Sequence, residues 1–184
     1  GSNLDGFDRK NFGAYLEHRL SIGDRVDVTP GMYTGWYTDF GWNFMPGIDV
    51  GYQLAEATRI YANVGKSFRI PTFFDQYYES PTELGDQDLK PEEAVSYELG
   101  IKNAGRWHSA EANLFYRDAS SVIDWVYDAG DSLWRAGNHS NVQASGLEFS
   151  MMLDFEQLVG PQCVVSKLHL SYNHIRQDLS NGEN

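Results

Sequence analysis

Aromatic side chains with the potential to bind a ligand gather in two stretches of the sequence. The first stretch holds Phe73, Phe74, Tyr77 and Tyr78, and the second holds Trp125, Tyr127 and Trp134. Aromatic faces stack on flat or apolar groups, and binding residues are often carried on surface loops. We therefore predict that these seven residues contact a ligand. The alternative is that the loops which carry them pack their aromatic rings against one another.

Acidic residues surround the first aromatic stretch. Lys90 is the only basic residue among them, and the acidic residues are Asp75, Glu79, Glu83, Asp86, Asp88, Glu92 and Glu93. The second stretch adds Asp124, Asp128 and Asp131. Calcium prefers several carboxylate and carbonyl oxygens, so a calcium ion that orders these loops is one prediction. A solvated acidic loop is the alternative, and we favour it because the carboxylates follow no fixed ligand spacing.

Catalytic and metal-binding patterns are not found in the sequence, and we predict neither an enzyme nor a resident metal. Ser67 and Ser171 lie in no Gly-x-Ser-x-Gly turn. His169 and His174 are five positions apart on a predicted strand, so their side chains face opposite sides. Cys163 is the single cysteine, and the net charge of −12 argues against nucleic acid as a partner.

Alternation of apolar and polar residues predicts the elements that position these side chains. In the run Phe44–Leu54 the even positions are apolar, whereas the odd positions are small or polar, with Met45 the exception. No stretch has a convincing helical period. Eight runs with this pattern predict eight strands: Phe12–Ser21, Val26–Trp36, Phe44–Leu54, Ile60–Phe68, Val95–Lys102, His108–Tyr116, Gly146–Phe155 and Val164–Asn173.

The lengths of the strands and of their connections favour a membrane β-barrel. The runs are about 9–12 residues long, the length needed to cross a bilayer at a tilt. Both long connections, Arg69–Pro91 and Tyr127–Asn138, fall at one end of the predicted meander, and more than half of the aromatic residues lie there too. The short connections Ser21–Arg25, Ala55–Thr58, Asn103–Arg106 and Glu156–Pro161 fall at the other end.

From the length of 184 residues and the strand pattern, we predict a single barrel domain over residues 11–175. Residues 1–10 are interpreted as a leader that begins with a cloning remnant, and residues 176–184 as a polar tail. The fold class is all-β, an antiparallel up-and-down meander of about eight long strands. With no run of about 18 apolar residues, no transmembrane helix is predicted.

Four motifs in a fixed order resemble the late barrel region of TonB-dependent outer-membrane receptors. They are the stretches Tyr61–Tyr77, Asp88–Lys102, Asn113–Trp125 and Asn138–Glu148. The loop Gly85–Leu89 departs from the Gly-Asn-Pro-x-Leu that is common in the family. The motif residues are predicted to have structural roles: Gly65, Phe68, Arg69, Pro71, Leu89, Pro91, Glu92, Gly146 and Glu148. Arg69 is expected either to pair with an acidic loop residue or to extend outward.

The resemblance implies a 22-stranded barrel with a plugged lumen, of which eight strands are one part. It implies a receptor in the outer membrane of a Gram-negative bacterium, in contact with lipid, that imports cobalamin, a siderophore or a similar scarce solute. The TonB-type energising complex is expected to act through segments absent from this chain. Two alternatives stay open: a free-standing eight-stranded barrel with an adhesive or structural role, and a soluble carbohydrate-binding β-sandwich.

Overall fold

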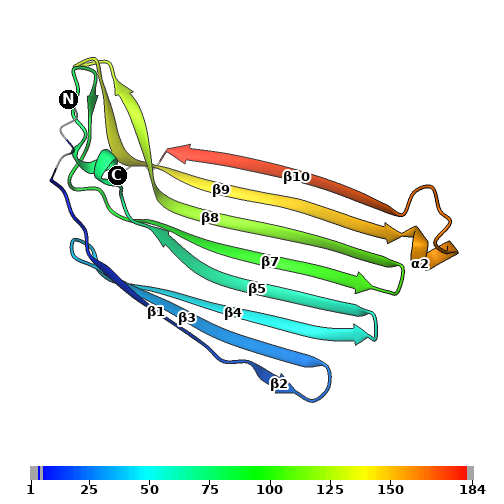
Figure 1. Cartoon of the computed structure of the whole chain (residues 1–184). Coiled ribbons are helices and arrows are strands. Elements are labelled where there is room, and N and C mark those ends of the chain that lie inside the picture. Colours follow the sequence, from blue (N-terminus) through cyan, green and yellow to red (C-terminus); the bar gives the residue numbers. More distant parts are fainter. Residues whose placement is uncertain (1–3, 5, 182–184) are drawn as a thin grey trace.

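The computed structural model describes residue 4 and residues 6–181, and these residues form one curved sheet of long strands (Figure 1). Two single-turn helices, α1 (Phe73–Tyr77) and α2 (Phe155–Val159), interrupt the strands. The strands are β1 (Asn11–Glu17), β2 (Leu20–Ile22), β3 (Val26–Tyr37), β4 (Gly41–Ala55), β5 (Thr58–Arg69), β6 (Glu83–Leu84), β7 (Glu92–Ala104), β8 (His108–Asp128), β9 (Leu133–Asp154) and β10 (Lys167–Asn181).

The strand order is that of an antiparallel meander. Each strand of the path β1-β3-β4-β5-β7-β8-β9-β10 pairs with its neighbours in the list, and the short strands β2 and β6 lie off this path. The eight-stranded all-β prediction is therefore confirmed. Among the described residues no helix is long and apolar enough to cross a membrane.

The register places the predicted apolar positions on one face of the sheet. Leu99 lies between Ala62 and Leu114 in the neighbouring strands, and Leu114 lies opposite Leu147. This apolar face is open: Leu99 and Leu114 are each more than half exposed. In the described part of the chain, only Leu89, Ala94 and Ala136 are buried hydrophobic residues. Within residue 4 and residues 6–181 the sheet packs on no second sheet, which disfavours the β-sandwich alternative.

The first predicted strand, Phe12–Ser21, is divided in the structure. Strand β1 ends at Glu17 and β2 begins at Leu20, but both pair with β3 in the same register. The His18 N–H donates to the Pro30 carbonyl at 3.1 Å between them. The division is therefore an interruption of the ladder and not a change of direction.

The prediction of a long loop over Tyr127–Asn138 is wrong. Strands β8 and β9 stay paired with each other as far as Asp128 and Leu133. Their connection is therefore a tight turn, and the two strands form a long hairpin. Their register shifts between Ala119 and Val122, where Ser121 has a φ of 56°. Such a bulge bends a strand. The hairpin end turns away from the plane of the sheet at the upper left of Figure 1.

The predicted polar tail is also wrong over residues 176–181. Strand β10 pairs with β9 as far as Asn181, which lies opposite Ser140, so the barrel segment continues past 175. Residues 182–184 lie outside the described residues. At its other end β10 begins at Lys167, later than Val164, because α2 and the residues after it occupy the connection from β9. The prediction of a short connection over Glu156–Pro161 is therefore wrong: the connection spans residues 155–166.

Candidate functional site

Arg69 and Glu92 close the base of the first long loop. They are register partners where β5 ends and β7 begins. Arg69 Nε donates to Glu92 Oε2 at 2.8 Å, a second guanidinium nitrogen contacts Oε1, and a third lies 3.5 Å from Asp75 Oδ2. Arg69 thus pairs with acidic residues, one of the two arrangements expected from the sequence. Paired charges at this position hold the two strand ends together.

Glu92 also accepts a hydrogen bond from a backbone N–H, and its contacts lower its pKa. Partial burial favours the neutral acid, but hydrogen bonds from Arg69 and from the Ile123 N–H at 2.8 Å outweigh it. The pKa of Glu92 therefore lies below its ordinary value of 4.5. Since the folded-state pKa is lowered, the stabilisation is present above pH 4.5 and is lost as the pH falls through the lowered pKa.

We therefore expect acid to loosen the loop between Arg69 and Glu92. Backbone hydrogen exchange of residues 70–91, corrected for the intrinsic effect of pH, should rise as the pH falls below 4.5. Glu92→Gln should weaken the loop at neutral pH and reduce its dependence on pH. Unchanged protection in the native protein well below pH 4.5 would contradict this account of Glu92.

Helix α1 begins directly after this ion pair. Thr72 is its N-cap: Asp75 N–H donates to Thr72 Oγ1 at 3.1 Å, and Thr72 N–H donates to Asp75 Oδ2 at 3.0 Å. Pro71, before the cap, is fully buried. Gly85 packs against the helix, and a Cβ there would lie 2.8 Å from the Asp75 carbonyl oxygen. Only glycine fits this contact, so Gly85 fixes how the loop returns past α1.

Arg9, which lies within the predicted leader, contacts this site, whereas the predicted cloning remnant at residues 1–3 lies outside the described residues. Arg9 donates to the Pro71 carbonyl and to Gln76 Oε1, both at 2.8 Å, and it pairs with Asp39 at 2.7 Å. Its guanidinium lies 4.7 Å from the centre of the Phe73 ring. Gln76 is buried, so Arg9 satisfies a polar group that would otherwise be unpaired.

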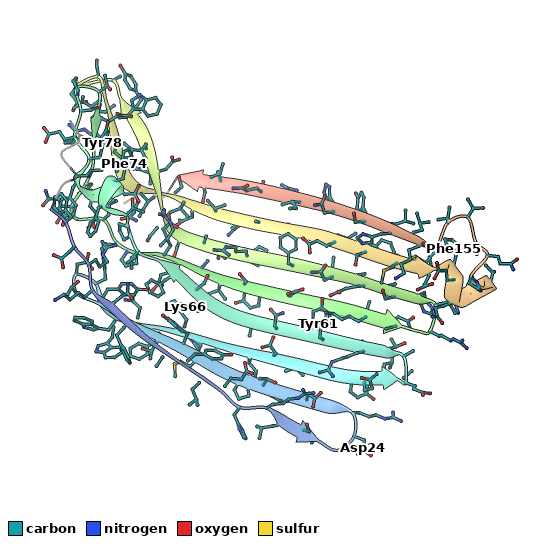
Figure 2. The ribbon with its side chains drawn as sticks, in the orientation of Figure 1. Asp24, Tyr61, Lys66, Phe74, Tyr78 and Phe155 are labelled. Atoms are coloured by element: carbon teal, nitrogen blue, oxygen red, sulfur yellow. The ribbon has the colours of Figure 1, made fainter. Side chains whose placement is uncertain are left out.

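The seven predicted ligand aromatics form three groups. Phe74 stacks on Tyr78 with ring centres 4.3 Å apart and lies 5.5 Å from Trp125. Tyr127 and Trp134 pair on the hairpin at 5.6 Å. Phe73 and Tyr77 pack instead on Phe7, with the Tyr77 ring 4.1 Å from it. Figure 2 shows Phe74 and Tyr78 at the end of the sheet opposite to Asp24 and Phe155.

Asn138 fastens the first loop to the hairpin. Its side chain accepts from the Lys90 N–H at 2.8 Å and donates to the Lys90 carbonyl at 2.9 Å and the Ser121 carbonyl at 2.6 Å. Strand β6 adds a short parallel pairing, with Glu83 opposite Trp134. The two long segments are therefore one hydrogen-bonded unit. We call residues 70–91 and the hairpin end 121–138 the clamped loops.

A polar groove is lined by residues of the clamped loops and by the β9 residues that follow them. It has a volume of about 970 Å³, and its lining includes Asp86, Lys90, Arg135, His139 and Asn141. Ala136, one of its lining residues, is buried. The rings of Phe74, Tyr78 and Trp125 are not among its lining residues, but Trp125 is the register partner of Ala136, which lines the groove.

Several acidic side chains of the clamped loops stabilise turns. Asp86 accepts from the Asp88 N–H at 2.9 Å, Asp128 from the Gly130 N–H at 2.8 Å, and Asp131 from the Leu133 N–H at 3.2 Å. Over residue 4 and residues 6–181, no three acidic, His or Cys side chains come together as a metal site. The calcium ion stays a prediction from the sequence.

The remaining motif residues lie along the strands. Phe68 makes an edge contact with Tyr37 at 5.7 Å, and Pro91 precedes β7. A Cβ at Gly65 would have no atom within 4 Å, so the space beside this residue is open. At Gly146 a Cβ would lie 2.6 Å from the Phe115 ring, so this glycine lets the ring cross β9.

Glu148 belongs to a polar cluster that sequence reasoning missed. Asn113 donates to Glu98 at 2.8 Å and to Glu148 at 3.3 Å, and Tyr61 donates to Glu111 at 2.8 Å and to Glu98 at 3.2 Å. All these residues lie on the face opposite to the apolar one. Polar residues at alternate positions of the strands were the signal in the sequence that could have identified this cluster.

Comparisons with known proteins agree with this architecture. A family model described as TonB dependent receptor-like, beta-barrel matches residues 1–183. The vitamin B12 transporter BtuB of Vibrio vulnificus strain CMCP6 is 26% identical over 80% of this chain and 22% of its own length. The ferric enterobactin receptor PirA of Pseudomonas aeruginosa is 21% identical over 78% of this chain and 22% of its own length.

Solved structures share the fold. The siderophore receptor PirA from Pseudomonas aeruginosa superposes with a TM-score of 0.75 at 19% identity, over 92% of this chain and 32% of that protein. The FrpB iron transporter from Neisseria meningitidis has a TM-score of 0.71 at 16% identity, over 94% of this chain and 26% of that protein. The chain spans about a fifth of the curated relatives it matches. It belongs to the TonB-dependent receptor family and forms part of its β-barrel.

Proposed function

We propose that this chain forms part of the wall of an outer-membrane receptor that binds a scarce solute and imports it. The open apolar face would contact lipid, and the opposite face, with Glu98, Glu111 and Glu148, would line the lumen. The observation that carries the proposal is the group of Phe74, Tyr78 and Trp125. These rings come from two segments that Asn138 fastens together at the end with the longest loop.

The cargo we propose is a large ring-containing solute with polar substituents. The aromatic group suits the flat part of such a molecule. The groove with Asp86, Lys90 and His139, whose lining residue Ala136 pairs with Trp125, suits its polar part. Two relatives are named for vitamin B12 and ferric enterobactin, which makes these two compounds the first probes to use.

The receptor would take energy from a TonB-type complex and would reside in the outer membrane of a Gram-negative bacterium. Uptake of labelled vitamin B12 and labelled ferric enterobactin by cells that carry the receptor would test this role. We expect one probe to be bound and imported, with import lost but binding kept in cells without the TonB-type complex. Failure of the intact receptor to bind or import either probe would count against the proposed cargo class, and adhesion without uptake would favour the free-standing barrel.

A further inference from the structure

The connection between β9 and β10 differs from the other connections at its end of the sheet. The turns after β2, β4 and β7 are short, whereas residues 155–166 contain α2 and form a closed loop. The Phe155 N–H donates to the Ser166 carbonyl at 2.8 Å across the loop mouth, and Asp154 caps α2 by accepting from the Gln157 N–H at 3.0 Å. The loop therefore has a defined shape of its own.

This loop exposes aliphatic side chains. Val164 is fully exposed, and its exposed neighbours are Leu158, Val159 and Val165. Glu156 is the only charged residue in 155–166, whereas Asp24 and Glu56 occupy other turns at this end. A group of aliphatic side chains in water is unfavourable, and such a patch usually marks an interaction surface.

The loop that carries these exposed aliphatic residues begins where the apolar face of the sheet ends. Leu153 and Leu168 form the last apolar pair of β9 and β10 before the loop begins. On the other side of β9, Leu153 lies opposite His108, whose ring is 4.4 Å from that of the exposed Trp107. Tryptophan is enriched where a membrane meets water. Continuity with the face assigned to lipid therefore points to lipid as the occupant of this patch.

We propose that loop 155–166 inserts Leu158, Val159, Val164 and Val165 into the interfacial layer of the bilayer and anchors this end of the barrel wall. The Arg106 side chain donates to Gln157 at 3.3 Å and ties α2 to the neighbouring turn. The anchor would thus hold β7 to β10 at a fixed depth. It rests on the membrane location proposed above.

Fluorescent probes at single cysteines in the intact, membrane-inserted receptor test this anchor. In a Cys163→Ala background, Val164→Cys would carry the probe, with Leu114→Cys as the lipid-face reference and Asp24→Cys as the matched turn at the same end (Figure 2). Vesicles with and without brominated lipid give the readout. We expect brominated lipid to quench the probes at 164 and 114 and to leave the probe at 24 unchanged.

Two results would overturn the anchor. In the first, the probe at 114 is quenched while that at 164 behaves like the probe at 24, so water covers the loop. In the second, the probe at 164 is shielded from aqueous iodide but is not quenched by brominated lipid, so protein covers it. Loss of quenching at 114 would instead contradict the proposed membrane location itself and the anchor with it.

Discussion

Replacing Asn138 with alanine is expected to free residues 84–90 from the hairpin. The change removes three hydrogen bonds and leaves the Lys90 N–H, the Lys90 carbonyl and the Ser121 carbonyl without this partner. Three bonds at about 0.5–1.5 kcal/mol each sum to about 1.5–4.5 kcal/mol. Because the two bonds to Lys90 are exposed, the free energy of loop opening should fall by about 2 kcal/mol, in the lower part of this range. The open population would then rise about thirtyfold, and hydrogen exchange of residues 84–90 would measure it.

Two variants make this test specific to Asn138. Asn141→Ala removes one long hydrogen bond, in which the Ser121 N–H donates to Asn141 Oδ1 at 3.4 Å. This variant should change the hydrogen exchange of residues 84–90 little. Asn138→Asp keeps the acceptor for the Lys90 N–H but loses the amide donor, so its effect should be smaller than that of alanine. Equal protection of residues 84–90 in Asn138→Ala and Asn141→Ala would show that β6 alone holds the loop.

The second large effect is expected from arginine on the apolar face. Phe149 lies on this face of β9 between Ala112 and Tyr172, and Ser150 is the next residue, on the polar face. A cationic residue in the lipid-facing midplane of a barrel strand destabilises it by about 2–4 kcal/mol. Phe149→Arg should therefore lower the free energy of unfolding in lipid vesicles by this amount.

Ser150→Arg is the matched control on the opposite face. It would extend into the groove that Glu98, Glu111 and Glu148 line, where a positive charge is attracted. Unfolding by urea in lipid vesicles compares the two variants. If Phe149→Arg were as stable as Ser150→Arg, the apolar face would be in contact with water and the barrel-wall assignment would fail.

The main strands were predictable because their pattern is local. Alternation needs only neighbouring positions, and the register of the structure places Leu99, Leu114 and Leu147 side by side as that pattern requires. The hairpin was missed because the shift near Ser121 breaks the alternation. Polar residues such as Asp128 and Asp131 then make strand ends resemble a loop.

The contacts that build the site were less predictable because they join distant positions. Arg9 reaches Gln76, and Asn138 reaches Lys90, through side chains whose neighbours give no periodic signal. The end of β10 was missed for a related reason. Arg176 and Asp178 are polar and pair with each other, so only the ladder with β9 shows that they belong to a strand.

Equilibrium binding of vitamin B12 and ferric enterobactin to variants of the intact receptor tests the cargo site most directly. Trp125→Ala removes the ring that contacts Phe74, and a stacked aromatic ring contributes about 0.5–1.5 kcal/mol beyond its buried area. Trp107→Ala removes an exposed ring at the opposite end and serves as the control. We predict that Trp125→Ala lowers the receptor's affinity for the probe that it binds by about tenfold, whereas Trp107→Ala leaves this affinity unchanged. Equal affinity in both variants would contradict a cargo site on the aromatic group of the clamped loops.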